Sequence, residues 1–415
     1  MARVTEALPG RGMQSAAAAI SFEEEEGTFQ TGGVATIAAG HAIHDTYTAF
    51  LPPLLPALIA RFGLSTAEAG VLNVFMTWPS LLQPFIGHLA DRVSLRYFVL
   101  LGPAITATMM SLLGRAPSYG VMALFLIVVG LSSAGLHAVG PVMGGRLSGR
   151  NLGRGMGFWM VGGELGRALG PLVVVSALAV LRLEGIAWLM IGGWAATGVL
   201  YLKLRHIPGR PGSPAAVRPW RQALRAMRPL LVPMAGVVAA RSLLASGLTT
   251  YLPTFLSREG TSLWLAGASL SVLEVAGIAG VLIGGSLSDR LGRRLVLLAS
   301  LAGPGLLTFP FLATRGWTQL LLLVLLGFTT LSTTPVIMAL VQESFPQNRA
   351  LANGIYMAIT FVIQSTAIVV VGLLADYFGL RTAFLVSAVV ALLGAPLVFL
   401  LPTHRPQSET ASSGS

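Results

Sequence analysis

The chain lacks cysteine, so disulfide bonds, thiolate metal ligands and a cysteine nucleophile are excluded. Lysine is nearly absent too: Lys203 is the single one, and no glycine-rich phosphate-binding loop precedes it, which excludes an ATPase of the Walker type. Charged residues make up 10% of the chain, against about 25% in an ordinary soluble domain. This scarcity of charge is atypical of a soluble domain.

Apolar side chains dominate instead. Of the 415 residues, 54% are hydrophobic, and the mean hydropathy is +0.76. Apolar runs of about 18 residues or more recur along the chain, and this is the length that a helix needs to cross a bilayer. The sequence therefore predicts an all-α membrane protein with the lipid bilayer as its main solvent. The net charge of +11 lies mainly in short loops, so it indicates membrane orientation and no nucleic-acid partner.

The order of the apolar segments predicts twelve transmembrane helices in two pseudo-symmetric bundles of six. The predicted segments are residues 34–59, 68–90, 97–115, 119–145, 154–180, 185–203, 229–256, 262–288, 295–314, 317–342, 350–375 and 381–401. The predicted regions are an N-terminal cytoplasmic tail at 1–33, a first bundle at 34–203, a basic linker at 204–228, a second bundle at 229–401 and a disordered C-terminal tail at 402–415.

Basic residues are distributed unequally between the two sides of the membrane. Loops on the side of the termini hold seventeen Lys and Arg residues, whereas the opposite loops hold six. The positive-inside rule therefore predicts cytoplasmic termini in a cell inner (plasma) membrane. The linker spaces Trp220, Leu224 and Met227 at helical intervals, which predicts an amphipathic helix on the anionic inner leaflet. A flexible basic loop is the alternative.

A charged pattern occurs twice, at residues 87–96 (GHLADRVSLR) and 285–294 (GSLSDRLGRR). Because both copies lie between long apolar runs, the repeat indicates two related halves. Each carboxylate is expected to pair with a loop arginine and to meet the positive N-terminus of another helix, as a cytoplasmic gate. A charge cluster that only sets orientation is the alternative. The predicted gate residues are Gly87, Asp91, Arg92, Arg96, Gly285, Asp289, Arg290 and Arg294.

The twelve segments, the two halves, the basic linker and the repeated loop resemble the major facilitator superfamily. The second loop fits that family's pattern Gly-x-x-x-Asp-Arg-x-Gly-x-Arg in full, whereas the first has Ser94 in place of the later glycine. The resemblance covers the chain after residue 33. It implies a secondary active transporter that works by alternating access, without a catalysed reaction and without a cofactor.

A narrower resemblance is to the fosmidomycin-resistance branch of that superfamily. Residues 40–47 (GHAIHDTY) and 162–171 (GGELGRALGP) are similar to segments of the branch's first and fifth helices, and residues 342–354 to its tenth-to-eleventh connection. The branch's His-Pro-Glu of helix four begins here with His137 but lacks the proline and the glutamate, and Glu164 replaces an asparagine. The resemblance implies export of a drug or another small organic compound.

The fifth segment also carries a pattern similar to the superfamily's antiporter motif. It consists of Gly157, Gly166, Gly170 and Pro171, and two valines follow in place of the motif's last glycine pair. The resemblance implies antiport. Glycines at this spacing also let two helix backbones approach closely, and proline bends a helix, so helix packing alone is the alternative.

Ionisable side chains inside apolar segments are costly, at about 2.5–3.5 kcal/mol each near the bilayer centre. With a rise of about 1.5 Å per residue, Asp45, Glu164, Arg241 and Glu274 fall near the middle of their segments, where such transporters build their site. Asp45 and Glu164 are the predicted proton carriers, because a cavity that is alternately wet and dry changes the proton affinity of a carboxyl group. Glu274 is a third candidate. A fixed ion pair with Arg167 is the alternative role of Glu164.

Two arginines are predicted to bind an anionic substrate, because guanidinium grips phosphate or carboxylate by paired hydrogen bonds. They are Arg167 and Arg241, and Arg241 has the alternative of pairing with Asp45, Glu164 or Glu274. Aromatic and imidazole side chains are expected to complete the site. The predicted substrate-binding residues are His44, Tyr47, His137, Trp159, Arg167, Arg241 and Tyr356.

A metal-ion site is a further interpretation of the same region. His41 and His44 share a helix face with Asp45, and His137 supplies another imidazole, which together are ligands of the kind that zinc takes. Histidines in a transporter cavity more often bind substrate or hold a helix contact, so no bound metal is predicted.

These patterns predict a proton-coupled antiporter that exports a small organic compound, with the proton as coupling ion. The chain is expected to be no enzyme and to work as a monomer. Three alternatives stay open: a proton-coupled importer or carrier of a lipid-like substrate, a divalent metal-ion transporter, and a membrane sensor that transports nothing.

Overall fold

The structure is a computed structural model that describes residues 28–90, 93–209, 220–345 and 349–401. Every regular element within these ranges is a helix, and no strand occurs among them. The predicted all-α class is therefore confirmed for the described part. Helices satisfy their own backbone hydrogen bonds, which is what lipid requires of such apolar segments.

The first half runs from α2 to α9, with three short 3-10 turns. The bounds are α2 Thr31–Thr48, α3 Leu51–Phe62, α4 Thr66–Thr77, η1 Trp78–Leu82, α5 Gln83–Ala90, α6 Tyr97–Leu112, η2 Leu113–Arg115, α7 Tyr119–Ser148, α8 Leu152–Gly185, η3 Ile186–Leu189 and α9 Met190–Leu204. Proline and capping residues determine where several of these helices begin. Two prolines open α3, and a reciprocal capping box between Ser65 and Glu68 starts α4.

The second half runs from α10 to η4. The bounds are α10 Trp220–Arg258, α11 Leu263–Leu291, α12 Arg293–Ala313, α13 Trp317–Leu331, α14 Thr333–Ser344, α15 Arg349–Gly394 and η4 Ala395–Leu400. The turn between α11 and α12 is a single residue, Gly292, with a φ of 91°. This left-handed conformation favours glycine, which explains the later glycine of the second charged loop.

Eight helical stretches of the described chain are long and apolar enough to cross a membrane. Two of them, Leu152–Leu204 and Gly354–Leu400, have 53 and 47 residues, and since one crossing takes about 20 residues each can cross twice. Each is interrupted once, at Arg182 and at Gly379, where the backbone leaves helical geometry. Residues 34–90 are divided among shorter helices. The protein is multi-pass, and the number twelve stays a prediction.

The two halves repeat one packing pattern. In the first half α8 packs along α2, and α7 packs on α6. In the second half α15 packs along α10, and α13 packs on α12. The internal repeat that is visible in the charged loops therefore extends to the arrangement of the helices.

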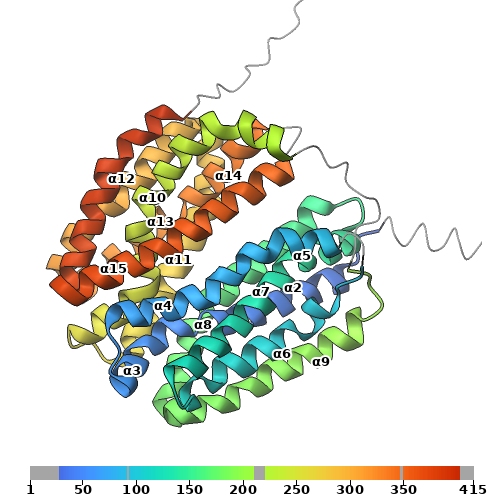
Figure 1. The fold of residues 1–415 in the computed structure, drawn as a ribbon, viewed down its shortest axis with the longest axis horizontal. Helices are drawn as coiled ribbons and strands as arrows, with labels where there is room; N and C mark the ends of the chain where they lie inside the picture. Colours follow the sequence, from blue (N-terminus) through green and yellow to red (C-terminus); the bar gives the residue numbers. More distant parts are fainter. Residues whose placement is uncertain (1–27, 91–92, 210–219, 346–348, 402–415) are drawn as a thin grey trace, which may run out of the picture.

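The halves meet through α3, α4 and α8 on one side and α10, α11 and α15 on the other. Figure 1 shows two groups of helices side by side, with α4 next to α15 and α8 next to α11. At one end a single hydrophobic core joins both halves, and it includes Phe50 and Leu54 together with Tyr251 and Phe255.

The other end of the molecule has no shared core among the described residues. There the first half buries a cluster around Val34, Val99 and Leu147, and the second half buries a separate one around Leu297 and Leu401. This is the end at which α2 begins and the described chain stops. Among the described residues, the halves thus share a hydrophobic core only at one end, the closed end, which lies away from Thr31 and Leu401.

Polar contacts also connect the two halves at the closed end. Asp376 of α15 accepts hydrogen bonds from the backbone N–H groups of Thr66 and Ala67, at 2.6 and 2.9 Å, at the start of α4. Arg258 donates to the Thr66 hydroxyl, and the Tyr251 hydroxyl donates to the Thr66 carbonyl at 3.3 Å. The N-terminus of a first-half helix is therefore capped by a carboxylate of the second half.

Residues 1–27 of the predicted N-terminal tail, residues 210–219 of the predicted linker and the predicted C-terminal tail at 402–415 lie outside the described residues. Of the predicted amphipathic helix, residues 218–219 are not described, and from Trp220 onward the chain is helical and continues directly as α10. Met227, which was expected to face the membrane surface, is fully buried in the core of the second half. That part of the interpretation is wrong, because the linker helix and the following segment form one helix that packs on its own bundle.

Candidate functional site

The candidate site is built where α2 and α8 lie in direct backbone contact. Gly162, Gly166 and Gly170 of α8 face the carbonyl oxygens of Ala38, Ala42 and Thr46 of α2, and a Cβ at any of the three glycines would overlap its carbonyl. Both sets recur every four residues, so the two helices keep one register over two turns. Small residues permit this approach, which brings their polar side chains together in a narrow space.

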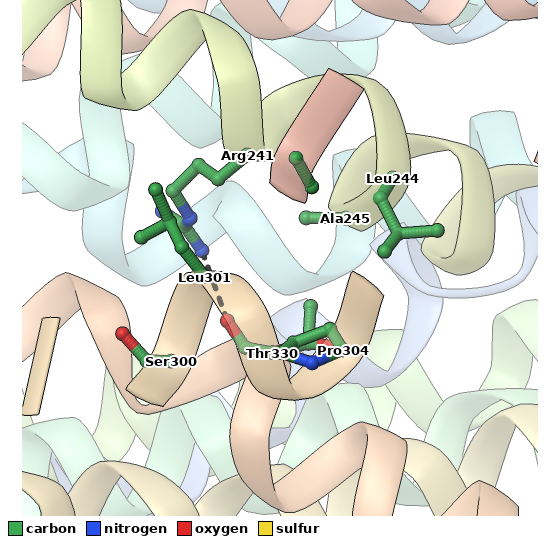
Figure 2. A pocket seen from close by; sticks show the side chains of 8 residues that line it. Arg241, Leu244, Ala245, Ser300, Leu301, Pro304 and Thr330 are labelled. Atoms are coloured by element: carbon green, nitrogen blue, oxygen red, sulfur yellow. Dashed lines mark hydrogen bonds between the residues drawn. The ribbon is translucent and has the colours of Figure 1, made fainter. Parts of the chain in front are cut away.

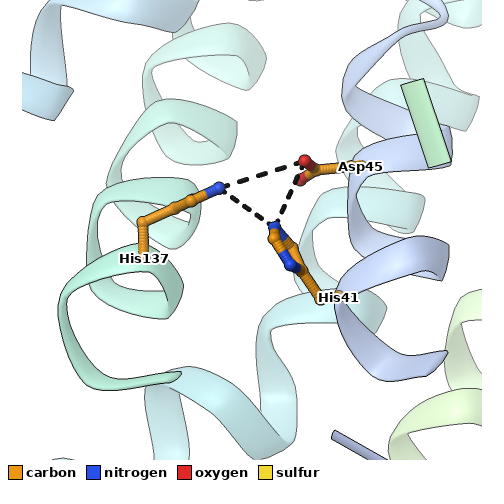
Figure 3. A group of neighbouring side chains, drawn as sticks. All are labelled: His41, Asp45 and His137. Carbon is orange, nitrogen blue, oxygen red and sulfur yellow. Dashed lines mark hydrogen bonds and ion pairs between the residues drawn. The ribbon is translucent and has the colours of Figure 1, made fainter. Parts of the chain in front are cut away.

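Three side chains converge beside this contact. His41 and Asp45 lie one turn apart on α2, and His137 reaches them from α7 (Figure 3). His41 Nε2 is 3.2 Å from His137 Nε2 and 3.3 Å from Asp45 Oδ2, and the His137–Asp45 separation is 3.9 Å. Gly163 leaves the space for them, since a Cβ there would strike the His41 ring.

Hydrogen bonds fix the tautomers of both imidazoles. His41 Nδ1–H donates to the Trp159 carbonyl, and His137 Nδ1–H donates to the Ser133 carbonyl, each at 2.9 Å. In the neutral rings both Nε2 atoms are then acceptors. Two acceptors and a carboxylate oxygen thus face one another. A proton within the cluster, on an imidazole or on the carboxyl group, or a bound metal ion would relieve the repulsion between these atoms.

His44 orients the same carboxylate from the other side. Its Nδ1–H donates to Asp45 Oδ1 at 2.9 Å, and the His44 side chain is fully buried. Its Nε2 has no partner among the described residues. The structure therefore brings the predicted residues His44 and His137 to the predicted proton carrier, where His44 acts on Asp45 and shows no exposed surface toward a substrate.

An ion pair on α8 borders the cluster. Arg167 lies 2.5 Å from Glu164 and 4.0 Å from Asp45 Oδ2, so one guanidinium faces two predicted proton carriers. Glu274 of α11 interacts electrostatically with Arg167 and Glu164 across the contact between the halves. The three predicted carboxylates and Arg167 thus form one charged network that spans both halves.

Two predicted aromatic residues have different surroundings. Trp159 stacks on the His41 ring, with centroids 3.8 Å apart, and so forms one wall of the cluster. Tyr47 is buried, and its hydroxyl donates to the Leu189 carbonyl in η3. The Tyr47 contact holds two elements of the first half together.

Arg241 and Tyr356 lie in the second half and are not part of the cluster. Arg241 donates to the Thr330 carbonyl at 3.2 Å and to the Thr334 hydroxyl at 3.4 Å, and Figure 2 shows its side chain crossing from α10 toward α13. The alternative pairing of Arg241 with Asp45, Glu164 or Glu274 does not form in the described structure, where Arg167 is the arginine that pairs with Asp45 and Glu164. Tyr356 is fully buried, and its substrate-binding role stays a prediction.

The glycines of the predicted antiporter motif separate into two groups. Gly166 and Gly170 belong to the α2–α8 contact, whereas a Cβ at Gly157 would meet no atom within 4 Å. Helix α8 continues through Pro171. Gly162, which the motif omits, takes the third contact position. Its spacing of four residues from Gly166 was the signal that could have identified it.

The predicted gate is described only in part. Asp91 and Arg92 lie outside the described residues, and Gly87 has open space around it. Arg96 precedes α6 and lies over the Tyr97 ring, 5.4 Å from its centroid.

The second copy forms its contacts within its own half. Asp289 pairs with Arg293 at 2.6 Å, and Arg293 also pairs with Glu343 of α14 at 2.5 Å. Arg294 donates to the carbonyls of Phe399 and Leu401. Gly285 and Arg290 complete the predicted set, and Arg290 is exposed. Sequence reasoning missed Arg293 and Glu343 as the central pair, although both lie in segments that it singled out.

The fold and the site together define a polytopic transporter, and comparison with known proteins agrees. The family model of the Major Facilitator Superfamily matches residues 37–317 and 270–415. The chain belongs to the major facilitator superfamily.

Individual relatives match about nine-tenths of the chain. The fosmidomycin resistance protein of Escherichia coli (strain K12) is 27% identical over 387 residues, which cover 90% of this chain and 93% of that protein. A bacterial homologue of the human lysosomal transporter Spinster has a similar structure, with a TM-score of 0.78, 15% identity and coverage of 90% and 96%. A D-xylose–proton symporter gives a TM-score of 0.70 at 16% identity, covering 89% and 97%. The two solved structures support the fold alone.

Proposed function

We propose that the protein is a proton-coupled antiporter that exports a small organic compound across the cell inner (plasma) membrane. Twelve spans with cytoplasmic termini would place the charged network near mid-depth. The name of the fosmidomycin resistance protein supports efflux as the direction. The proton is the coupling ion, the protein works as a monomer, and no further cofactor takes part.

The observation that carries the proposal is the cluster of His41, Asp45 and His137 next to the Glu164–Arg167 pair. A proton among its acceptor atoms would relieve their mutual repulsion and is the smallest cation that could do so. Arg167 lies close to both Asp45 and Glu164, so a change of charge on one carboxylate changes the electrostatic energy of the other. Glu274 extends the coupling to the second half, which is what an alternating-access cycle needs.

The closed end fits one state of that cycle. With the termini in the cytoplasm, the end sealed by Asp376 and the shared core faces outward. The protein would then be inward-facing, with its two halves separate at the cytoplasmic end. The paired loops at residues 87–96 and 285–294 would meet the opposite half only in the outward-facing state.

Flux across proteoliposomes under an imposed pH gradient tests the proposal. An antiporter accumulates substrate in the acidic compartment, because protons leave that compartment as substrate enters it. A symporter accumulates substrate in the alkaline compartment instead. A panel of small organic compounds, with fosmidomycin among them, would be assayed in both gradient directions.

Carboxylate variants test the assignment of the carriers. Asp45→Asn and Glu164→Gln are expected to lose gradient-driven accumulation by about tenfold or more while they retain exchange of substrate without a gradient. Glu184→Gln, in an exposed ion pair with Arg61, serves as the control. If both buried variants keep gradient-driven accumulation, the carrier assignment is wrong.

Transport of a divalent metal ion is a second candidate function. The ligand atoms of His41, Asp45 and His137 lie within 4.8 Å of one another. Ligands of a tetrahedral zinc ion are about 3.3 Å apart, close to two of the three separations in the cluster. Wild-type vesicles would then take up Zn²⁺, and His137→Ala would abolish that uptake. Organic flux without any Zn²⁺ binding eliminates this candidate.

A further inference from the structure

A second buried charge lies in the second half, apart from the charged network. Arg241 is 6% exposed. Its two terminal nitrogens donate to the Thr330 carbonyl and the Thr334 hydroxyl, and no carboxylate of the described chain forms an ion pair with it. A guanidinium keeps its charge inside a protein, and a buried charge without a counter-charge is unfavourable. An anion bound next to Arg241 would compensate this charge.

Two hydrogen-bond donors at this place have no acceptor. They are Arg241 Nε–H and the Thr330 hydroxyl, and both atoms are buried without a partner among the described residues. Both residues line one small pocket between α10, α12, α13 and α15, shown in Figure 2. Unsatisfied buried donors are rare in native proteins, so a pair of them on one pocket indicates a ligand that accepts.

The remaining walls of the pocket narrow the choice of ligand. They are mostly apolar and come from Leu244, Ala245, Leu301 and Pro304. The Ser300 hydroxyl is the other polar group, and it already donates to Leu297 and accepts from Thr333. The cavity measures about 10 Å³, which is roughly the space of one water-sized particle. An organic anion is too large.

Water and a monatomic anion are the two occupants of suitable size. A water molecule would accept from Arg241 and could donate to the hydroxyl oxygens of Thr330 and Ser300, but it would leave the charge uncompensated. A halide accepts several hydrogen bonds, donates none and neutralises the guanidinium. The uncompensated charge of Arg241 therefore favours the halide.

We propose that this pocket binds one halide ion, held by Arg241 Nε–H and the Thr330 hydroxyl, with chloride as the physiological occupant. The ion would join α10 to α13 and so make the second half more rigid. The proposal is independent of the proposed transport function, because none of its residues belongs to the charged network.

Halide-dependent stability tests the proposal. The purified protein, in nanodiscs of zwitterionic lipid, would be heated in sodium gluconate that is replaced stepwise by sodium chloride or bromide at constant ionic strength. Binding to the folded state alone predicts a saturable rise of the unfolding midpoint. In bromide-soaked crystals an anomalous peak is expected between Arg241 and Thr330.

Three variants separate the site from general salt effects. Arg241→Met is expected to abolish the halide response, and Thr330→Val is expected to weaken the apparent halide affinity about five- to tenfold through loss of one hydrogen bond. Thr329→Val is the matched control, because the Thr329 hydroxyl bonds to the Leu325 carbonyl of its own helix. It should respond like the wild type.

Two results would overturn the proposal. One is a wild-type midpoint that is identical in gluconate, chloride and bromide. The other is an Arg241→Met variant that keeps the wild-type halide response. If that variant does not fold, bromide-soaked crystals of the wild type decide the question. The absence of an anomalous peak at Arg241 would show that the pocket binds no halide, and would overturn the proposal.

Discussion

At the scale of single residues, Asp45 differs from the other two carboxylates of the network. Three imidazoles and one guanidinium lie within 4.0 Å of it. Glu164 has the neighbouring Arg167, whereas Glu274 meets the network only across the contact between the halves. Asp45 is therefore the carboxylate whose charge is most strongly tied to the positions of its neighbours.

The position of a residue along its apolar segment predicts its depth in the membrane, but it does not predict which way the side chain points. Arg167 and Arg241 were both candidates to face the carboxylates, and packing decided between them. The direction of a side chain around a helix axis depends on its neighbours, and the α2–α8 contact that turns Arg167 toward Asp45 involves residues more than a hundred positions apart. A rise per residue carries no such information.

Tyr47→Phe tests a residue that was predicted to bind substrate. Since the Tyr47 hydroxyl donates to the Leu189 carbonyl, its removal is expected to lower the free energy of unfolding by about 1 kcal/mol. The KM for substrate should remain unchanged. Thermal unfolding in detergent and initial rates of flux measure the two quantities. A raised KM with unchanged stability would restore the substrate-binding interpretation.

At the scale of elements, the apolar segments were predicted well where helices are long and uninterrupted. The predicted segment 97–115 coincides with Tyr97–Arg115, and the segment 119–145 lies within Tyr119–Ser148. Of the breaks within residues 34–90, the one between α3 and α4 was predicted, whereas those before α3 and at η1 were not, because they lie at prolines that an apolar run tolerates in sequence. The α2–α8 register was likewise invisible, since it requires both helices.

Gly166→Ala and Gly157→Ala form a matched pair on α8. A methyl group at Gly166 would overlap the Ala42 carbonyl, so this variant is expected to lose about 1–3 kcal/mol of stability as the helices move apart. Gly157→Ala has open space and should be neutral or gain about 0.5–1 kcal/mol, because alanine favours helix. Unfolding midpoints measure both. Equal losses in the two variants would contradict a packing role confined to Gly166.

At the scale of the whole molecule, the repeat of the charged loops predicted two halves, and the packing of the helices repeats in the same way. The seal between the halves was not predicted. Asp376 carries no motif, and its partners are backbone N–H groups of a helix some three hundred positions earlier, so no side-chain pattern marks the contact.

Asp376→Ala is expected to favour opening of the sealed end. The variant loses two hydrogen bonds to the start of α4, and contact with solvent keeps the effect to about 1 kcal/mol, or roughly a fivefold shift of the equilibrium. Glu259→Ala is the control at the same end, because Glu259 pairs with Arg315 and Arg381 of its own half.

Distances between spin labels measure this shift. The absence of cysteine lets Pro117→Cys and Ala313→Cys be labelled without background, and both positions are exposed, one in each half at the sealed end. The Asp376→Ala protein should populate longer distances than wild type and than the Glu259→Ala control. Identical distributions in all three would show that the shared hydrophobic core alone holds this end closed.

The cap that Asp376 places on α4 also makes opening a hydration step. When the end opens, the N–H groups of Thr66 and Ala67 exchange a carboxylate for water, and the apolar surface around Tyr251 becomes wet. Water then enters the equilibrium as a reactant. Sucrose and similar osmolytes, which are excluded from protein surface, lower its activity and favour the sealed state. The rate of turnover should therefore fall with osmotic strength even at constant substrate and constant pH gradient.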